Sequence, residues 1–216
     1  LQAFPYTLKL SIIAALVAWL IGIPAGIVSA VKKNSVLDHL FMGVSLMGVS
    51  MPVFWAALLF QYIFAYKLGW FPVSGTNGWT SYVLPSIVLG WSSAGTIARL
   101  TRSNLLETLE DDYIRTAWAK GLGQAGVIVK HAFKNALLPV ITMMAIQVAS
   151  LLSGAVITES VFAIPGVGRL AVDAISSRDM PLLQGTVVFT TILIILGNLL
   201  ADVLYSVIDP RIRTDH

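Results

Sequence analysis

Long runs of apolar residues, separated by polar stretches, follow one another along the whole chain. A helix needs about 20 consecutive apolar residues to cross the hydrocarbon core of a bilayer. Segments of alternating polarity, which are typical of membrane barrels, are absent from the sequence. We therefore predict an all-α membrane protein, a polytopic bundle with five transmembrane helices. The predicted spans are Leu10–Val31, Leu40–Tyr66, Ser81–Ala98, Asn135–Thr158 and Met180–Ala201.

Lys and Arg residues predict the orientation of this bundle. Ten of them lie on one side of the predicted spans and four on the other, and loops rich in Lys and Arg stay in the cytoplasm. The chain is then expected to begin outside and to end inside the cell. We predict that residues 1–216 form a single membrane domain. Because the chain starts outside and its first residue is Leu1, we expect that one N-terminal helix of this domain is absent from the sequence.

The polar stretch 99–134 between two spans is the most informative part of the pattern. Its 36 residues include six Lys or Arg and four Asp or Glu, far more than a simple turn needs. Asp111 and Asp112 are good N-cap residues, and Tyr113–Lys120 has no helix breaker. Gly121 and Gly123 then allow a helix stop and a sharp turn. We predict a short helix here, followed by a second one over Val127–Ala136.

Two interpretations of the first short helix stay open at this point. Ile114, Ala117 and Trp118 recur at helical spacing and share one side of it. The helix could therefore rest on the lipid interface as an amphipathic segment. Alternatively, the small residues Thr116 and Ala119 allow it to fit closely into a groove on a soluble partner.

Composition and chemistry narrow the function classes. The chain is 56% hydrophobic and 12% charged, whereas soluble domains carry about 25% charged residues. It has no cysteine, and its three His residues lie at or beyond the predicted cytoplasmic ends of the spans. An intramembrane enzyme is therefore not expected. An ion-coupled secondary carrier, which normally needs a deep acidic residue, and a membrane scaffold are the alternatives to an ATP-driven transporter.

The motif Arg115-Thr116-Ala117, with Gly121 and the later Leu138-Pro139, resembles the cytoplasmic EAA loop of binding-protein-dependent ABC permeases. That loop has Glu-Ala-Ala, three residues, Gly, and a stretch ending in Leu-Pro. The Arg-Thr-Ala variant resembles the first permease subunit of the dipeptide/oligopeptide/nickel branch. The resemblance implies that residues 99–134 form an ATPase-coupling loop. Its implied coupling residues are Asp112, Tyr113, Arg115, Thr116, Ala117, Trp118, Ala119, Lys120, Gly121 and Pro139.

Four further stretches are similar to the same branch. They are Leu68–Gly75, Glu159–Gly168, Arg178–Gly185 and the C-terminal Asp209–Arg213. The resemblance implies that the second and third belong to an outer loop that gates the pathway or meets a binding protein. The residues implied for this role are Glu159, Phe162, Pro165, Gly166, Gly168, Arg178 and Asp179.

The resemblance implies the type I ABC importer permease fold and a multi-subunit machine in a bacterial or archaeal plasma membrane. Its expected partners are a second permease, two ATP-binding subunits, an extracytoplasmic substrate-binding protein and the lipid bilayer, with no nucleic acid. The resemblance implies no catalytic residue, metal or cofactor in this chain, because ATP and Mg²⁺ would bind to the partner ATPase. The absence of a GxxxxGK[ST] phosphate loop fits a chain that binds no nucleotide itself. Members of the branch carry dipeptides, oligopeptides, glutathione or nickel, and we expect a peptide importer.

Overall fold

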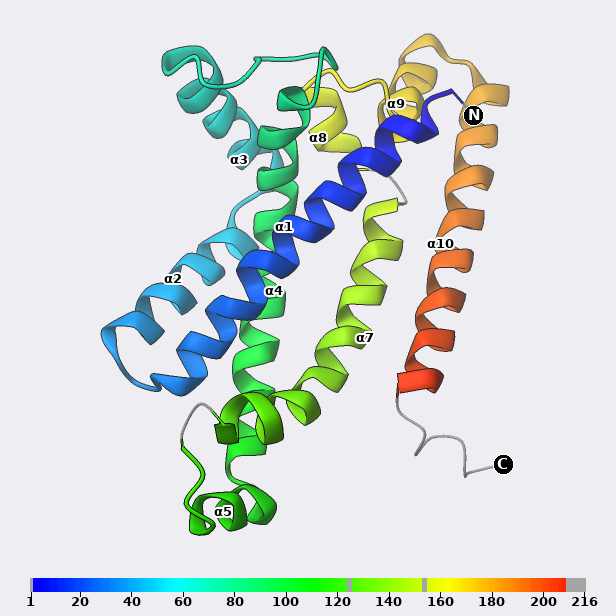
Figure 1. Cartoon of the computed structure of the whole chain (residues 1–216). Coiled ribbons are helices and arrows are strands. Elements are labelled where there is room, and N and C mark those ends of the chain that lie inside the picture. Colours follow the sequence, from blue (N-terminus) through cyan, green and yellow to red (C-terminus); the bar gives the residue numbers. More distant parts are fainter. Residues whose placement is uncertain (1, 124–125, 153–154, 209–216) are drawn as a thin grey trace.

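The structure of the chain, a computed structural model, describes residues 2–123, 126–152 and 155–208 (Figure 1). The predicted all-α class is confirmed for these residues, which contain helices and no strand. In chain order the elements are α1 (Phe4–Val31), α2 (Val36–Ser50), α3 (Val53–Phe60), the π-helical η1 (Gln61–Lys67), α4 (Thr80–Leu109), α5 (Asp112–Ala119), the π-helical η2 (Val127–Ala132), α7 (Phe133–Leu152), α8 (Val156–Val161), α9 (Val167–Ser177) and α10 (Met180–Ile208).

The long helices α1, α4, α7 and α10 run between two ends of the bundle (Figure 1). The short helix α5 lies beyond one end, which we call the α5 end. Helices α8 and α9 lie at the other, together with the starts of α1 and α10, and we call this the α9 end. The two polar regions singled out in the sequence are therefore at opposite ends of the molecule.

The five predicted membrane spans are only partly matched by helices of sufficient length and hydrophobicity. Among the described residues, three helices are long and apolar enough to cross a membrane: α1, the continuous Val127–Leu152, and Met180–Leu199. A fourth results if α2 and α3–η1 count as one broken span. The predicted span Ser81–Ala98 lies within α4, whose buried side includes many small and hydroxyl residues. Because such residues serve helix packing rather than contact with lipid, α4 is less apolar, and five spans are not confirmed.

The predicted span Leu40–Tyr66 is broken in the middle. The helical path bends by 108° between α2 and α3–η1, at Met51 and Pro52. Met51 is extended, with φ −79° and ψ 129°, which is the conformation that a following proline favours. Proline also has no backbone N–H to continue the helical hydrogen bonds. Pro52 therefore ends α2 and starts α3 in a new direction.

Close approach of α1 and α4 forms the centre of the bundle. Gly22 and Gly26 lie one turn apart on α1, and a Cβ atom added to them would lie 2.7 Å from the Ala94 carbonyl oxygen and 2.5 Å from the Ala98 carbonyl oxygen, respectively. Small residues spaced in this way let membrane helices pack backbone against backbone. The same contact includes Gly90 of α4, which faces the Ala14 carbonyl.

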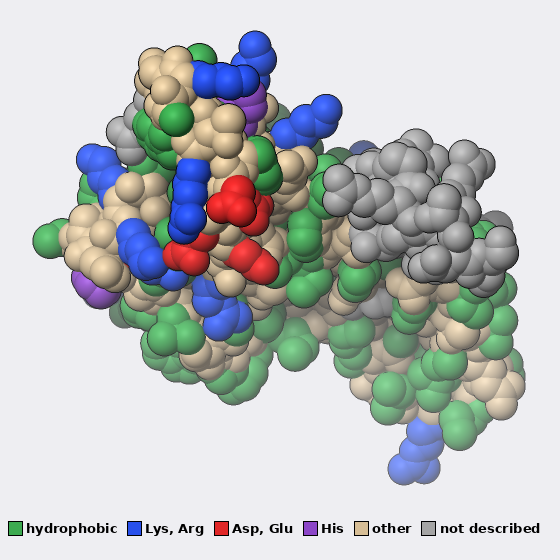
Figure 2. Space-filling model, turned by 90° about the horizontal axis from the view of Figure 1, so that it is seen from below, with side chains coloured by type: hydrophobic (Ala, Val, Ile, Leu, Met, Phe, Trp, Pro, Cys, Tyr) green, Lys and Arg blue, Asp and Glu red, His purple; other side chains and the backbone are tan. Residues whose placement is uncertain are grey.

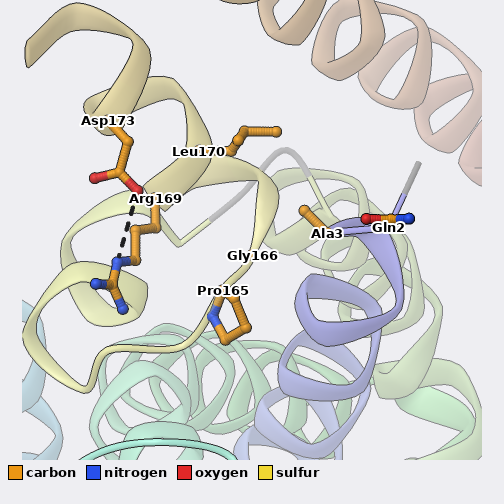
Figure 3. Close-up of a pocket in the computed structure, with 7 residues that line it drawn as sticks. All are labelled: Gln2, Ala3, Pro165, Gly166, Arg169, Leu170 and Asp173. Carbon is orange, nitrogen blue, oxygen red and sulfur yellow. Dashed lines mark ion pairs between the residues drawn. The ribbon is translucent and has the colours of Figure 1, made fainter. Parts of the chain in front are cut away.

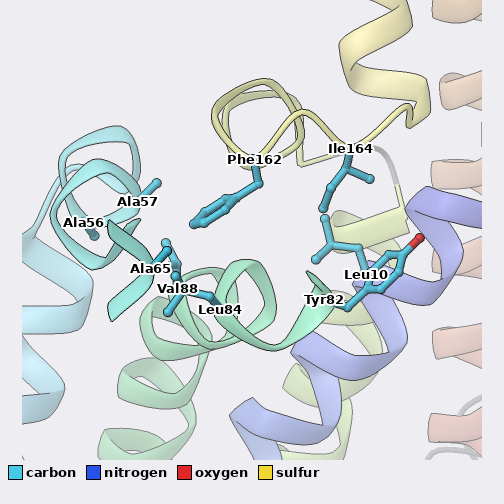
Figure 4. Packing of buried hydrophobic residues seen from close by; sticks show 9 residues of the cluster. All are labelled: Leu10, Ala56, Ala57, Ala65, Tyr82, Leu84, Val88, Phe162 and Ile164. Atoms are coloured by element: carbon cyan, nitrogen blue, oxygen red, sulfur yellow. The ribbon is translucent and has the colours of Figure 1, made fainter. Parts of the chain in front are cut away.

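A hydrophobic cluster joins the segments at the α9 end (Figure 4). Polar contacts support it: Gln61 Nε2 donates to the carbonyl oxygens of Val73 at 2.8 Å and Val161 at 3.2 Å, and the Gly75 N–H donates to the Phe162 carbonyl at 3.0 Å. Two stretches that resemble family motifs, Leu68–Gly75 and Glu159–Gly168, are thus brought together. The buried members of the cluster are Leu10, Ala56, Ala57, Ala65, Tyr82, Leu84, Val88, Phe162 and Ile164.

Candidate functional sites at the two ends of the bundle

Helix α5 confirms the short helix predicted in the polar stretch, and one side of it is packed against the bundle. Ile114 is fully buried and Ala117 nearly so. They join a cluster to which α1, α4, η2 and α7 all contribute. Because residues of α1, α4 and α7 contact the same cluster, α5 is packed directly against the bundle. The other buried members are Ala30, Leu105, Val127, Ala132 and Ala136.

The turn that ends α5 depends on one glycine. Gly121 has φ +77°, in the left-handed region that residues with a Cβ atom rarely adopt, and its N–H donates to the Trp118 carbonyl at 2.9 Å. Gly123, predicted to share this role, does not have a positive φ. At the other end of the helix, Asp111 occupies the N-cap position as predicted, but its side chain makes no capping hydrogen bond.

The opposite side of α5 is exposed. Tyr113 and Trp118 remain 41% and 43% exposed, although Trp118 was predicted to lie with Ile114 and Ala117. Trp118 therefore lies outside the buried cluster, on the exposed side of α5. Asn135 Nδ2 at the start of α7 donates to Tyr113 Oη at 2.8 Å, which adds a polar tie to the apolar one. The remaining exposed side chains are Asp112, Arg115, Thr116, Ala119 and Lys120.

The charges at this end are arranged in a pattern. Seen from the α5 end, acidic side chains form one patch with Lys and Arg around it (Figure 2). The exposed acids near α5 are Glu107, Glu110, Asp111 and Asp112. Glu107 belongs to α4, which continues well beyond the predicted end of its span at Ala98, and Glu110 is the C-cap residue of that helix. The surface thus offers two aromatic side chains beside a mixed charged rim, a composition that suits contact with another protein.

Most of the residues implied for ATPase coupling therefore belong to α5. Two of them, Ala117 and Pro139, differ from the others in position. Ala117 faces the chain's own core, so it can act only by holding α5 in place. Pro139 lies apart from α5, on α7, inside a helix that continues from η2. The continuous helix tolerates this proline, which is exposed.

An ion pair near the α5 end was not foreseen in the sequence, where we expected little buried charge. The Asp38 carboxylate is 2% exposed and accepts from Arg102 Nε and Nη2, each at 2.8 Å. It also accepts from the Ser29 hydroxyl at 2.8 Å and the Asn34 N–H at 2.9 Å. Helices α1, α2 and α4 therefore meet at this one carboxylate. The capping signal Ser35–Asp38 was visible in the sequence, but its distant arginine partner was not.

Glu159, which was predicted to belong to a loop that gates the pathway or meets a binding protein, lies at the α9 end and is fully buried. Thr7 Oγ1 donates to its Oε1 at 2.7 Å, and the Arg169 N–H donates to its Oε2 at 3.0 Å. Phe162, Gly166 and Gly168 are buried as well, so these four residues lie inside the chain rather than on its surface. Their place in a loop that gates the pathway or meets a binding protein stays a prediction.

Other residues of the predicted outer loop are accessible. Pro165, Arg178 and Asp179 are exposed. Arg178 ends α9 with φ +57°, and Asp179 Oδ1 accepts from the Leu182 N–H at 3.0 Å at the start of α10. The C-terminal motif Asp209–Arg213, by contrast, lies outside the described residues.

A cleft of about 580 Å³ opens between α9 and the start of α1 (Figure 3). Arg169 and Asp173 line it and form a weak ion pair, with Nε and Oδ2 3.9 Å apart. Among the described residues, no group of three or more His, Asp or Glu could hold a metal ion. The other residues that line the cleft are Gln2, Ala3, Pro165, Gly166 and Leu170.

This arrangement of helices is also found in solved transporters. The chain matches a chain of the inward-facing MetNI methionine ABC transporter with a TM-score of 0.81, over 96% of this chain and 95% of that one, at 17% identity. It matches an amino acid ABC transporter with a TM-score of 0.69, over 97% and 92%, at 16% identity. The chain therefore has the type I ABC importer permease fold.

Residues 22–214 match the family of the binding-protein-dependent transport system inner membrane component, and the chain belongs to this family. It is 45% identical to the dipeptide transport system permease protein DppB of Alkalihalophilus pseudofirmus, over 98% of this chain and 73% of that protein. It is 42% identical to the glutathione transport system permease protein GsiC of Escherichia coli, over 97% and 69%. The chain is thus a permease component of an ABC transporter and is not itself catalytic.

Proposed function

We propose that this chain is the permease subunit of an importer of dipeptides or short oligopeptides, and that it forms half of the pathway with a second permease subunit. The relatives named for dipeptides and glutathione support a small peptide as substrate. The chain would contribute the helix surfaces that line the pathway. Substrate selection would belong mainly to an extracytoplasmic binding protein.

In this proposal the α5 end faces the cytoplasm and docks onto a separate ATP-binding subunit. The observation that carries it is the two-sided character of α5. One side is fixed in a core shared by α1, α4 and α7, and the other presents Tyr113 and Trp118. A force applied to the exposed side would therefore reach the long helices directly. Two partner subunits would bind and hydrolyse ATP with Mg²⁺, and their closure would shift the bundle between two states.

Copurification tests the proposal as a whole. The tagged native chain, isolated from its own membrane, is expected to bring along a second permease and the ATP-binding subunits. Mass spectrometry identifies them. An ion-coupled carrier or a scaffold, the alternative functions, would be isolated without an ATPase, and that result would refute the proposal.

The turn at Gly121 offers a sharper test. A valine at this left-handed position costs about 1–2 kcal/mol, so Gly121→Val is expected to displace the end of α5, abolish peptide uptake and leave the ATPase insensitive to substrate. Uptake into proteoliposomes and ATP hydrolysis are the measurements. Gly123→Val is the matched control, since Gly123 has an ordinary φ and open space around it, and it is expected to retain uptake. Normal uptake by Gly121→Val would contradict the coupling role of the turn.

Photo-crosslinking tests which surface meets which partner. A crosslinking side chain at Thr116 is expected to give adducts with the ATP-binding subunit and none with the binding protein. At Pro165, Arg178 or Asp179 the pattern is expected to be reversed, because these exposed residues lie at the opposite end. Adducts are identified by mass spectrometry. The same partner captured at both ends would contradict the proposed orientation.

A further inference from the structure

We propose that Glu159 is an internal clamp that fixes α9 to α1, and that the clamp sets the shape of the surface on which the binding protein docks. Glu159 and Thr7 are then positioning residues, which act through α9 and touch neither substrate nor partner. This inference rests on the proposed function, since it assumes that a binding protein docks at the α9 end.

The contacts of the carboxylate join α1 to α8 and α9, two consecutive helices that are far from α1 in the sequence. Its Oε1 accepts from Thr7 of α1, and its Oε2 accepts from the backbone N–H of Arg169 in α9. Glu159 itself belongs to α8. Thr7 Oγ1 accepts in turn from the Val167 N–H at 2.8 Å. Both Thr7 and Glu159 are fully buried, so water does not compete for these hydrogen bonds.

The electrostatics of α9 explain why a carboxylate is suited to this place. Val167 and Arg169 lie in the first turn of α9, where backbone N–H groups have no partner within the helix. The start of a helix also carries a partial positive charge, which favours an anion. A buried carboxylate without such donors would be strongly unfavourable. The Glu159 carboxylate therefore receives a hydrogen-bond donor from the first turn of α9, and a backbone N–H of that turn receives an acceptor.

Two glycines make room for this contact. A Cβ atom at Gly166 would overlap the Glu159 carboxylate, and one at Gly168 would lie 3.0 Å from Glu159 Oε2 and 2.8 Å from the Val156 Cα. Neither glycine has a positive φ, so close approach rather than backbone conformation requires them. The spacing of Glu159, Gly166 and Gly168 in the sequence thus has a physical cause, which is the insertion of a carboxylate against the start of a helix.

The clamp controls the cleft described above. One wall of the cleft is the start of α1, with Gln2 and Ala3, and the other is α9, with Arg169 and Asp173 (Figure 3). Thr7 is one turn along α1 from the first wall, and Arg169 is in the second wall. The hydrogen bonds through Glu159 therefore hold the two walls at a set distance, and the exposed Pro165 lies between them.

The test uses the complete reconstituted transporter and measures ATP hydrolysis against the concentration of binding protein loaded with alanyl-alanine. Thr7→Val keeps the shape of the side chain and removes the hydroxyl. It is expected to raise the half-saturating concentration of binding protein at least about tenfold, while the maximal rate stays within about twofold. Thr7→Ser restores the hydroxyl and is expected to restore the half-saturating concentration.

Glu159→Gln should act in the same direction as Thr7→Val. Ser176→Ala on α9 is the matched control, because that hydroxyl bonds only to its own helix, at the Val172 carbonyl.

A structural readout keeps the inference testable if Glu159→Gln fails to assemble. The chain has no cysteine, so Ala3→Cys with Leu170→Cys gives a pair across the cleft with no background from this chain. Thr7→Val is expected to change the rate of crosslinking of this pair at least severalfold. An unchanged rate with an unchanged half-saturating concentration would overturn the clamp. If the unaltered transporter shows no stimulation by any binding protein while Thr7→Val still alters crosslinking, the docking role and the proposed function fail instead.

Discussion

Asp38→Ala is expected to lower the free energy of unfolding by about 3 kcal/mol, in the low part of the range for breaking a buried ion pair. The change leaves the guanidinium of Arg102 without its partner and also removes the acceptor for Ser29 and Asn34. Arg102 remains 27% exposed, so water partly compensates its charge. Unfolding in mixed micelles with increasing SDS, followed by tryptophan fluorescence, measures the difference.

Two variants make the result for Asp38 specific. Asp173→Ala removes an exposed carboxylate that has only a 3.9 Å pair, and it is expected to change stability by less than about 0.5 kcal/mol. Asp38→Ala combined with Arg102→Met removes both charges and is expected to recover part of the loss, since an unpaired charge then no longer remains. A stability of Asp38→Ala equal to that of the Asp173 variant would show that the ion pair does not hold the helices together.

The second large effect is expected at the contact between α1 and α4. Gly22→Ala with Gly26→Ala places two methyl groups against backbone carbonyls of α4, 2.7 and 2.5 Å away, and a backbone cannot rotate aside as a side chain can. Overpacking of this kind costs about 1–3 kcal/mol for each site. We expect the double variant to separate the two helices and to prevent assembly of the transporter, as measured by size-exclusion chromatography of the purified complex.

Gly43→Ala is the matched control for this experiment. Gly43 is also a helical glycine, on α2, but nothing lies within 4 Å of the position of its Cβ. Alanine there is expected to be neutral or to stabilise by about 0.4–1 kcal/mol, because it restricts the unfolded chain. If the double variant of α1 assembles as well as Gly43→Ala does, the close packing of α1 and α4 is not required.

The fold was largely predictable because uninterrupted apolar stretches have few alternatives to helices in a membrane. The break at Pro52 interrupts the predicted span Leu40–Tyr66. A proline in a span is compatible with a bend or with a stop, and which of them occurs depends on the tertiary contacts. The extension of α4 to Leu109 was not foreseen. Charge marks the predicted end of its span at Ala98, yet charge ends a membrane span without ending a helix, and no breaker follows until Asp111.

Helix α5 was predicted almost to the residue, because its limits are local: Asp111 at the N-cap and Gly121 at the turn. The burial of Glu159 and of Asp38 was not foreseen, because their partners are distant in the sequence. Thr7 is 152 residues from Glu159, and Arg102 is 64 residues from Asp38. A single sequence indicates that a residue is charged. Only the folded chain shows whether that charge has hydrogen-bond or ion-pair partners inside the protein.

The break between α2 and α3 has a mechanical consequence. Helices α1 and α4 are continuous, with 28 and 30 residues, and are therefore about 42 and 45 Å long. A displacement at one end of such a helix moves its other end as well. At the joint, Met51 has an extended backbone and Pro52 has no N–H to donate, so the run of helical hydrogen bonds is interrupted between α2 and α3. If α5 docks on an ATP-binding subunit as proposed, a displacement of α5 would be transmitted along α1 and α4, whereas the angle between α2 and α3 could change at their joint.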